Sequence, residues 1–277
     1  MLAPDPELVR ELGQVLAPDR VLTRPLDLLG RSVDASIYRL IPRAVVRPKD
    51  MREVQGLLAW AGRRQRALTF RTAGTSLSGQ AVTDDILVEL APFWKSVRVL
   101  DGGRRVWTQP GVVGGYVNRL LAPLGYRLGP DPASIDAAMM GGILSNNSSG
   151  MCCGVALNSY HTLEAITVVL ADGTVVDTSR KEADQDLRRA RPDLHRGLVA
   201  LRDEVRADPD LVARIRRRFS RKNTTGYSIN AFLDHDLPAD ILSHLVIGSE
   251  GTLAFIANAT LRTIPEPPAR ATGLLYK

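Results

Sequence analysis

The sequence predicts an α+β fold made of two parts that join near residue 95. Between residues 44 and 90, a strand, a helix, a strand, a glycine-rich loop and another strand follow one another, an order typical of parallel βαβ pairing. Beyond residue 95, apolar segments flank the turn sequences Asp101-Gly102-Gly103 and Asp172-Gly173, which indicates antiparallel hairpins. The chain has 277 residues, 44% of them hydrophobic, which is enough for one large or two smaller cores.

We therefore predict three segments: 1–43 as a helical lead-in and arm, 44–95 as a first βαβ-type subdomain, and 96–277 as a second subdomain with a mixed, mainly antiparallel sheet and helices. Prolines interrupt the first segment repeatedly. After a strand at 45–46, Asp50 with Glu53 three residues later predicts a helix N-terminus. An apolar stripe at helical spacing follows, formed by Val54, Leu57, Leu58 and Ala61. Two more strands are predicted, one from Leu68 and one over 86–90.

In the second subdomain, the sequence predicts hairpins that alternate with helices. Strands are expected at 96–100 and 104–109, a helix at 114–124, and a second pair of strands at 163–170 and 174–177. Two helices follow at 195–206 and 210–219. The segment 244–253 is interpreted as an apolar strand entering a glycine turn, with a strand from Thr252 to Ile264 leaving it.

Charge and composition exclude several classes of protein. The net charge is +6, and the helix at 211–219 carries arginines that we interpret as a solvated basic face, since no nucleic-acid-binding motif accompanies them. A basic nucleic-acid or membrane-binding protein remains the alternative from another class. No apolar run approaches the ~18 residues of a membrane span, and no signal pattern opens the chain. We expect a protein of the cytoplasm, either soluble or peripheral at the inner membrane.

The two cysteines, Cys152 and Cys153, are adjacent in the sequence. Two neighbouring thiols cannot form a disulfide scaffold or a four-ligand metal site unaided, so no metal site is predicted. We interpret both as small packed residues rather than as redox thiols.

The stretch from Leu68 to Gln80 predicts a strand that runs into a loop of small residues. Gly74 and Gly79 permit backbone angles that other residues avoid, and the exposed amides of such a loop suit a phosphate group. Arg71 adds a fixed positive charge. The spacing of the two glycines matches a Walker A loop, but Gln80 and Ala81 stand where that motif requires Lys and Ser or Thr, which argues against an NTPase. A glycine-rich turn without a ligand is the alternative.

A second polar stretch spans residues 139–150. Gly141 and Gly142 permit close main-chain approach, and amide or hydroxyl side chains occupy all five positions from Ser145 to Ser149. Such a run is costly to bury unless each group has a partner, so we favour a bound polar ligand over a solvated loop.

Together, three loops resemble the FAD-binding, PCMH-type domain of the vanillyl-alcohol oxidase superfamily. The resemblance lies in the segments Arg71–Gln80, Pro130–Pro132, Gly141–Asn147 and Ile247–Leu253. It is strongest to the D-lactate and D-2-hydroxyglutarate dehydrogenase and glycolate oxidase flavoproteins. The segments Ser145–Asn158 and Arg221–Tyr227 are similar to the long bacterial proteins in which an iron–sulfur domain follows the flavin domain. The resemblance covers residues 20–277.

The resemblance implies that FAD lies between two α+β subdomains. The pyrophosphate would be held by the first loop, through Arg71, Thr72, Ala73, Gly74, Thr75, Ser76, Leu77, Gly79 and Gln80. The ribityl chain and flavin would lie along Pro130, Asp131, Ser134, Met140, Gly141, Gly142, Ser145, Asn146, Ser148 and Gly150. The adenosine end would lie against Val155, Ile247, Gly248, Glu250, Gly251 and Ile256. Because no histidine stands in the first loop, we expect FAD to be bound noncovalently.

The family reaction implied by the resemblance is the oxidation of a D-2-hydroxy acid of the D-lactate, D-2-hydroxyglutarate or glycolate class to the 2-oxo acid. Hydride passes to flavin N5 while a base takes the hydroxyl proton. The implied partners are the small-molecule 2-hydroxy acid, a cap domain that holds its carboxylate, and an iron–sulfur domain or subunit; the electron acceptor stays open, and no nucleic acid is implied. A non-catalytic FAD-binding subunit that needs these partners is the alternative.

Catalytic residues are not assigned from the sequence. Pro265, Pro267 and Pro268 and the tail ATGLLYK resemble a strand that enters a cap domain, so we expect an N-terminal fragment or a separate FAD subunit. The four histidines, His161, His195, His235 and His244, are interpreted as structural or exposed. Lys222, Asn223 and Tyr227 are expected either to reach the flavin edge or to form a helix end and turn.

Overall fold

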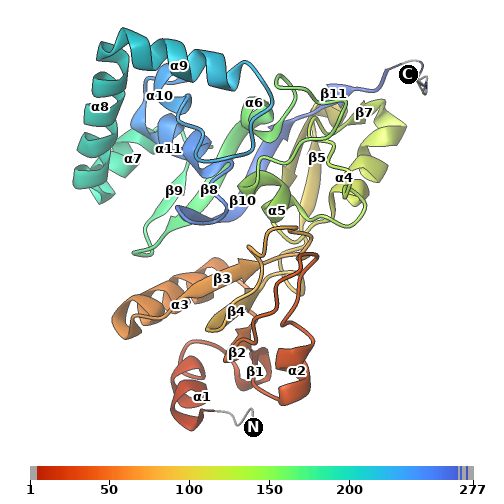
Figure 1. Ribbon diagram of the computed structural model, residues 1–277, viewed down its shortest axis with the longest axis vertical. Coiled ribbons are helices and arrows are strands. Elements are labelled where there is room, and N and C mark those ends of the chain that lie inside the picture. Colours follow the sequence, from red (N-terminus) through yellow and green to blue (C-terminus); the bar gives the residue numbers. More distant parts are fainter. Residues whose placement is uncertain (1–4, 268, 270–272, 274–277) are drawn as a thin grey trace.

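A computed structural model of the chain describes residues 5–267, 269 and 273. It consists of two lobes, with the N-terminal lobe below the larger one in Figure 1. Each lobe is built on its own main sheet, of four and five strands respectively. The predicted strand in the tail ATGLLYK lies outside the described residues, except for Gly273.

The first lobe is a four-stranded sheet in the order β1 (Val21–Leu22), β2 (Ala44–Val46), β4 (Ile86–Glu89) and β3 (Leu68–Arg71). β2, β4 and β3 are parallel, as predicted, while β1 adds an antiparallel edge from the segment expected to be an irregular arm. The crossover is α3 (Met51–Arg64), in which the Asp50 carboxylate accepts a hydrogen bond from the Glu53 N–H at 3.1 Å. Helices α1 (Pro6–Leu12) and α2 (Pro25–Leu29) complete the lobe.

The second lobe is an antiparallel sheet in the order β5 (Val97–Leu100), β6 (Arg105–Thr108), β10 (Ala254–Arg262), β8 (Leu163–Leu170) and β9 (Val175–Asp177). The predicted hairpins β5–β6 and β8–β9 are both present. The central strand β10 carries two register shifts where it pairs with β8. A separate pair, β7 (Tyr126–Arg127) and β11 (Ile264–Pro265), lies next to α4 (Gly114–Leu121), the helix expected over 114–124.

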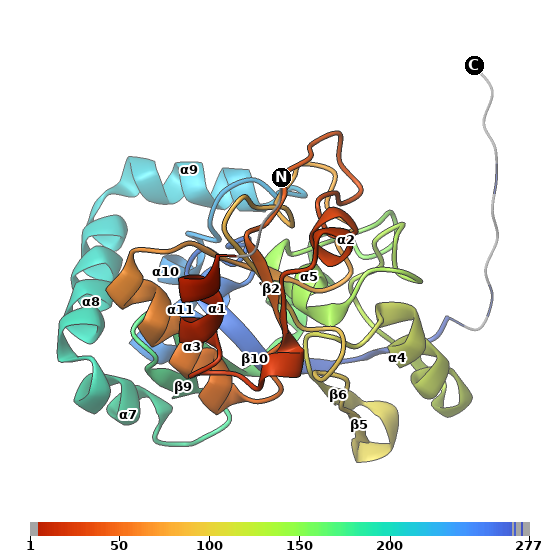
Figure 2. The ribbon, with the colours of Figure 1, turned by 90° about the horizontal axis from the view of Figure 1, so that it is seen from below.

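The remaining helices belong to the second lobe: α5 (Met140–Ser145), α6 (Ser159–Thr162), α7 (Ala183–Ala190), α8 (Pro192–Ala207), α9 (Pro209–Phe219), α10 (Ala231–Asp234) and α11 (Pro238–Val246). In Figure 2, α7–α9 wrap one side of β10 and α4 lies on the other. The two helices predicted at 195–206 and 210–219 are α8 and α9. In α9 only Ile215 is buried and its arginines are exposed, which confirms the solvated basic face.

The prediction for 244–253 was wrong in one respect: the apolar segment before Gly248 is the helix α11, not a strand. Pro238 occupies the first turn of α11, and the carboxylate of Asp240 interacts favourably with the positive end of the helix dipole. Seven of its nine residues are buried, and the segment taken as a strand began at His244, so it left out Asp240 and Ser243, which share a helical face with His244. A short apolar run of this kind cannot be assigned from periodicity alone. The second loop likewise contains the short helix α5, which was not predicted.

The two lobes share a hydrophobic core. Val169, Phe255 and Ala257, from β8 and β10, pack in the same cluster as the buried residues of the first lobe. The Phe255 ring lies 4.9 Å from that of Phe70 and 5.1 Å from that of Trp94, measured between centroids. This contact fixes one face of the five-stranded sheet against the four-stranded one. Among the described residues, no helix is both long and apolar enough to be a candidate membrane span.

Candidate functional site

A cavity of about 400 Å³ lies where the two lobes meet, and all three predicted loops line it. The first lobe contributes Phe70 and the loop after β3, and the second contributes α5 and the start of β10. Of the predicted cofactor residues, those that line the cavity are Arg71, Thr72, Gly74, Thr75, Ser76, Leu77, Gln80, Ser134, Gly141, Gly142, Ser145, Asn146, Ser148, Glu250, Gly251 and Ile256. Segments far apart in the sequence therefore form one site.

The other predicted residues do not line the cavity: Ala73, Gly79, Pro130, Asp131, Met140, Gly150, Val155, Ile247 and Gly248. Met140 and Ile247 are buried in the core of the second lobe. Asp131 shapes the second loop from behind, because its carboxylate accepts the N–H groups of Gly150 at 2.8 Å and Cys152 at 2.9 Å. Burial acts to raise the pKa of Asp131, but these backbone hydrogen bonds outweigh it and the pKa is lowered.

The cavity is also lined by residues that were not in the predicted cofactor set, namely Phe70, Ser78, Ala81, Leu90, Pro110, Pro132, Ala138, Ile143, Ser149, Lys222, Thr224, Ala254 and Phe255. Ser78, Pro132, Ile143 and Ser149 carried a signal, because they lie in the loop segments already singled out. Leu90 and Pro110 carried none, because only the packing of the two lobes brings them to the cavity. Lys222 and Thr224 did carry one, since they lie in the segment 221–227 that was expected either to reach the flavin or to form a turn.

The first loop presents free backbone donors to this cavity. Among the described residues, no acceptor takes the N–H of Gly74, Thr75 or Leu77. Gly74 and Gly79 have φ angles of +70° and +80°, which fold the loop back on itself. The Ser76 hydroxyl accepts the N–H of Ser78 at 3.1 Å and so tightens the turn. The result is an array of neutral donors that suits an anionic oxygen.

Arg71 lies beneath this loop. Its Nη1 donates to the carbonyl oxygen of Arg31 at 3.1 Å and to that of Ala81 at 3.4 Å. Burial lowers the pKa of Arg71, an effect that the carboxylates of Asp34 and Glu89 oppose, and a guanidinium in such a place stays charged. The predicted fixed positive charge is therefore held beside the first loop.

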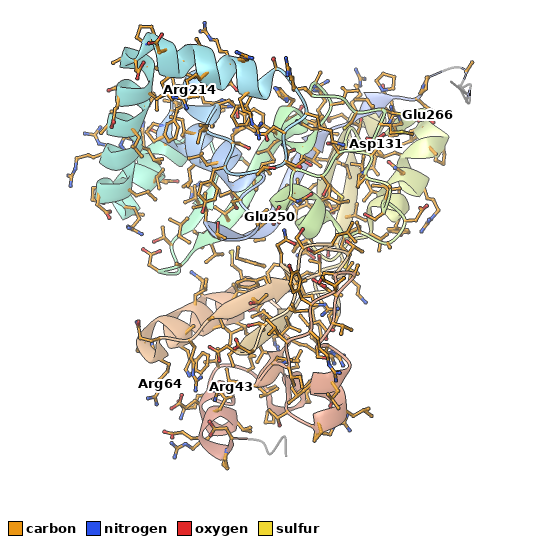
Figure 3. All side chains as sticks on the ribbon, viewed as in Figure 1. Arg43, Arg64, Asp131, Arg214, Glu250 and Glu266 are labelled. Carbon is orange, nitrogen blue, oxygen red and sulfur yellow. The ribbon has the colours of Figure 1, made fainter. Side chains whose placement is uncertain are left out.

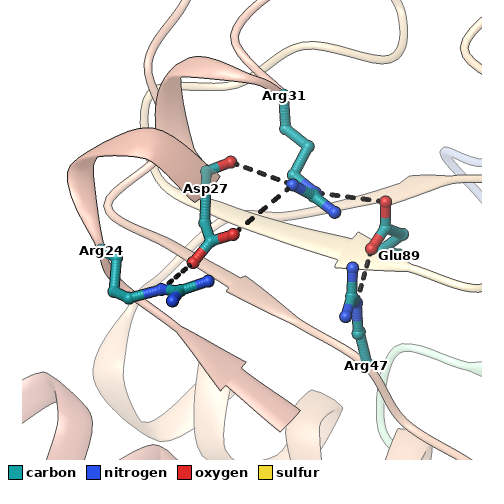
Figure 4. A network of polar contacts seen from close by, with 5 residues as sticks. All are labelled: Arg24, Asp27, Arg31, Arg47 and Glu89. Carbon is teal, nitrogen blue, oxygen red and sulfur yellow. Dashed lines mark hydrogen bonds and ion pairs between the residues drawn. The ribbon is translucent and has the colours of Figure 1, made fainter.

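The arm that precedes β2 supports the same loop from outside. The Ala35 N–H donates to the Gly74 carbonyl oxygen at 3.0 Å. Arg31, whose carbonyl holds Arg71, donates through Nε to Glu89 Oε1 at 3.3 Å, while Arg47 Nε donates to Glu89 Oε2 at 2.6 Å (Figure 4). Glu89 ends β4, so the network ties the arm, and through it the loop, to the rigid sheet.

The second and third loops are joined through α5. The Glu250 N–H donates to the Ser145 carbonyl oxygen at 2.8 Å, and the Gly248 N–H donates to that of Leu144 at 3.1 Å. The side chain of Glu250 points toward the junction of the lobes (Figure 3) and accepts a hydrogen bond from Asn146 Nδ2 at 2.5 Å. Burial raises the pKa of Glu250, and the Asn146 hydrogen bond opposes that shift.

Comparison with known proteins identifies the fold and its cofactor. The model of the family described as FAD binding domain matches residues 42–179, about half of the chain. This chain belongs to the FAD-binding domain family. The D-2-hydroxyglutarate dehydrogenase of Escherichia coli (strain K12) is 28% identical over 272 residues, which cover 95% of this chain and 26% of that protein. The glycolate oxidase subunit GlcD of the same strain is 35% identical over 140 residues, covering 50% of this chain and 28% of the subunit.

The chain covers more of the glycolate oxidase subunit GlcD of Bacillus subtilis (strain 168). The two are 26% identical over 98% of this chain and 48% of that subunit. The chain thus matches a quarter to a half of the length of these relatives. Among solved structures, an alkyldihydroxyacetonephosphate synthase superposes with a TM-score of 0.63 at 18% identity, covering 96% of this chain and 42% of that one. The predicted PCMH-type fold is confirmed.

The lining of the cavity fits FAD. The free amides of the first loop, with Arg71 behind them, suit the diphosphate. Gly141 lets α5 pack closely against Pro110, because a Cβ on Gly141 would lie only 2.6 Å from Cβ of Pro110. This packing brings Gly142 to the cavity. The assignment of single residues to parts of the cofactor stays a prediction.

The cysteines and histidines of the chain lie off the cavity, all of them within the described residues. Cys153 is buried as expected, but Cys152 is exposed, although both donate their N–H groups to the Asp131 carboxylate. His235 and His244 stack with their centroids 3.8 Å apart. Burial lowers the pKa of His244 to about 4, and its Nδ1 lies 2.8 Å from the Asp240 carbonyl oxygen.

Proposed function

We propose that this chain is the FAD-binding portion of a flavin-dependent dehydrogenase that oxidises a D-2-hydroxy acid to the 2-oxo acid. The observation that carries the proposal is the convergence of three loops from two lobes on one cavity whose first loop has unpaired amide donors. The relatives named D-2-hydroxyglutarate dehydrogenase and glycolate oxidase subunit GlcD support this class of substrate. D-Lactate belongs to the same class.

The residues of the chain have separate tasks in this proposal. The amides of Gly74, Thr75 and Leu77 bind the diphosphate, and Arg71 adds charge behind them. The polar side chains after α5 orient the ribityl chain, and the start of β10 packs against the other end. Once bound, FAD supplies the hydride acceptor. Noncovalent binding is proposed because the first loop contains no histidine.

We further propose that the base and the ligands of the substrate carboxylate come from a cap domain outside these residues, and that electrons leave through an iron–sulfur domain or subunit. Within the described chain, the ionisable groups that line the cavity are Arg71, Lys222 and Glu250, and Glu250 is already held by Asn146. The whole assembly would work in the cytoplasm or at the inner membrane.

FAD binding is tested first. The purified chain, titrated with FAD, should quench the flavin fluorescence at one equivalent, and acid precipitation should release intact FAD into the supernatant. A chain that takes up no FAD contradicts the proposal, and FAD that stays with the acid precipitate contradicts noncovalent attachment.

Substrate oxidation is a separate test, and it decides between the dehydrogenase and a non-catalytic FAD subunit. The scarcity of ionisable lining residues favours the subunit as the second candidate for the chain alone. Anaerobic addition of D-2-hydroxyglutarate, D-lactate or glycolate to the FAD-loaded chain should leave the flavin oxidised if a cap is needed. Bleaching of the flavin by one of them, and not by the L-enantiomer, would assign catalysis to this chain itself.

A further inference from the structure

Three ionisable side chains line the cavity in the described part of the chain, and only one of them is exposed at its mouth. Arg71 is anchored under the first loop, and Glu250 is bonded to Asn146. The third, Lys222, is exposed and has no carboxylate partner among the described residues. Glu250, the one acid that lines the cavity in the described residues, is held by Asn146 and forms no ion pair with Lys222, so this cation is suited to an anionic group on the ligand.

Hydrogen bonds at both ends fix the segment that carries Lys222. Its Nζ donates to the Ser149 carbonyl oxygen at 2.9 Å, next to the polar run of the second loop. At the other end, the hydroxyls of Tyr227 and Thr252 are 2.8 Å apart, and Ser228 Oγ donates to the Ile247 carbonyl oxygen at 2.8 Å. The segment 221–227 therefore spans from the second loop to the third, and Lys222 and Thr224 line the cavity between them.

The position of Lys222 separates it from the diphosphate cradle. The second loop adjoins the first at Gly142, where a Cβ would lie 3.4 Å from Thr72 Oγ1. Lys222 contacts the opposite end of that loop, at Ser149. The first loop already has Arg71 behind its amides, whereas no other cation of the described chain lines the part formed by Ser148, Ser149 and Thr224.

The chemistry of the flavin gives such a cation a role. A hydride adds two electrons and one proton, so the reduced ring is an anion unless it gains a second proton. An ammonium group has three donors, and Ser149 uses one of them, which leaves two donors and the full charge for a ligand. A positive charge beside the ring stabilises the anion more than the neutral oxidised form and so raises the reduction potential.

We propose that Lys222 supplies the positive charge that stabilises the reduced, anionic form of the FAD bound in this cavity. This inference rests on the proposed function, because it requires FAD in the cavity. It gives the segment 221–227 a direct role at the flavin instead of that of a simple helix end and turn.

The test compares FAD-loaded wild-type chain with Lys222→Met and Lys222→Arg. The reduction potential is measured by equilibration with a reference dye, and sulfite, which adds to flavin as an anion-forming nucleophile, is titrated as a second probe. Lys222→Met should lower the potential and weaken sulfite binding about tenfold, the effect of removing one nearby charge. Lys222→Arg, which keeps the charge, should stay close to wild type, and Lys181→Met, at an exposed lysine outside the cavity, should have no effect.

Two results would overturn the inference while leaving the proposed function intact. Equal potentials and sulfite affinities in wild type and Lys222→Met would show that the charge does not act on the flavin. Weaker FAD binding at an unchanged potential would make Lys222 a diphosphate ligand instead. If the wild-type chain takes up no FAD, the proposed function itself fails, and the inference fails with it.

Discussion

At the scale of the residue, Gly74 is constrained both by its backbone angle and by its neighbour. Its φ is +70°, and a Cβ would lie 2.6 Å from Arg71 Nη2. We expect Gly74→Val to abolish FAD retention, because the side chain would both strain the loop and displace the guanidinium that supports it. The left-handed angle alone should cost about 1–2 kcal/mol of folding stability. FAD content after gel filtration and the unfolding midpoint in urea measure the two effects.

Gly125 provides a matched control for this substitution. Its φ is +75°, no atom lies within 4 Å of its ideal Cβ position, and it does not line the cavity. Gly125→Val should therefore have a similar strain cost and keep its FAD. Normal FAD retention in Gly74→Val would mean that the first loop does not hold the diphosphate.

His244 predicts a pH dependence of stability. Its ordinary pKa is 6.5 and burial lowers the pKa to about 4 in the folded chain. Between these values the unfolded chain binds the proton more strongly, so stability is fully present above about pH 6.5 and is lost as the pH falls toward 4. From about pH 7 to about pH 5, the free energy of unfolding should fall by roughly 2 kcal/mol through this group.

Urea unfolding of wild type and His244→Gln at both pH values checks this prediction. Glutamine does not titrate, so the variant should lose less stability on acidification, even if it is less stable throughout. His235 stacks on His244, and burial lowers its pKa as well, so a residual slope is expected. Parallel pH profiles for the two proteins would show that His244 is not the titrating group.

At the scale of the element, the arm before β2 is predicted to control the first loop through Glu89. The Glu89 side chain is 17% exposed and receives both Arg31 and Arg47. Glu89→Gln would leave Arg47 without its carboxylate and Arg31 with Asp27 alone, 3.9 Å away, a loss of roughly 1–2 kcal/mol once their partial solvation is allowed for. Amide hydrogen exchange should rise across residues 31–38, and FAD should bind more weakly because the Ala35–Gly74 hydrogen bond loosens.

An exposed ion pair is the control for this element. Glu7 and Arg10 of α1 lie 3.7 Å apart with side chains 68% and 71% exposed. Glu7→Gln removes a carboxylate of the same kind and should change stability by less than about 0.5 kcal/mol, with exchange in the arm unaltered. If Glu89→Gln also leaves the amide hydrogen exchange of the arm and the affinity for FAD unaltered, the arm does not position the first loop.

Local signals in the sequence predicted the elements well where they were unambiguous and failed where burial removed them. The Asp50 cap and the turns at 101–103 and 172–173 were sufficient for α3 and both hairpins. α11 was mistaken for a strand because the segment considered began at His244 and held only the apolar end of the helix, without Asp240 and Ser243, the polar residues on the same helical face. α5 was missed because its two glycines and its short length give it no helical pattern.

At the scale of the whole molecule, the sequence indicated three loops but not how they meet. Small residues and free amides are local properties, so Gly74, Gly142 and Glu250 could be singled out from the sequence. The cavity also needs Phe70, Leu90 and Phe255, which come together only through the packing of one lobe on the other. No pattern within either segment reveals that packing, because each of these residues reads simply as part of a buried strand.

The shared core makes a final prediction about the cooperativity of the two lobes. Phe255 is 4% exposed, contacts Phe70 and Trp94, and also lines the cavity. Phe255→Ala should cost about 3–5 kcal/mol, as for other buried aromatic truncations. Because the lost contacts join the lobes, calorimetry should then show a departure from a single two-state transition.

Phe232→Ala separates this coupling from simple loss of core volume. Phe232 is 7% exposed and belongs to the core of the second lobe alone, so its truncation should be similarly destabilising while the lobes still unfold together. Added FAD should restore a single transition in Phe255→Ala, because a ligand held by loops of both lobes replaces the missing contact between them. A single transition in Phe255→Ala without FAD would mean that the remaining shared core, including Val169 and Ala257, is sufficient to couple the lobes.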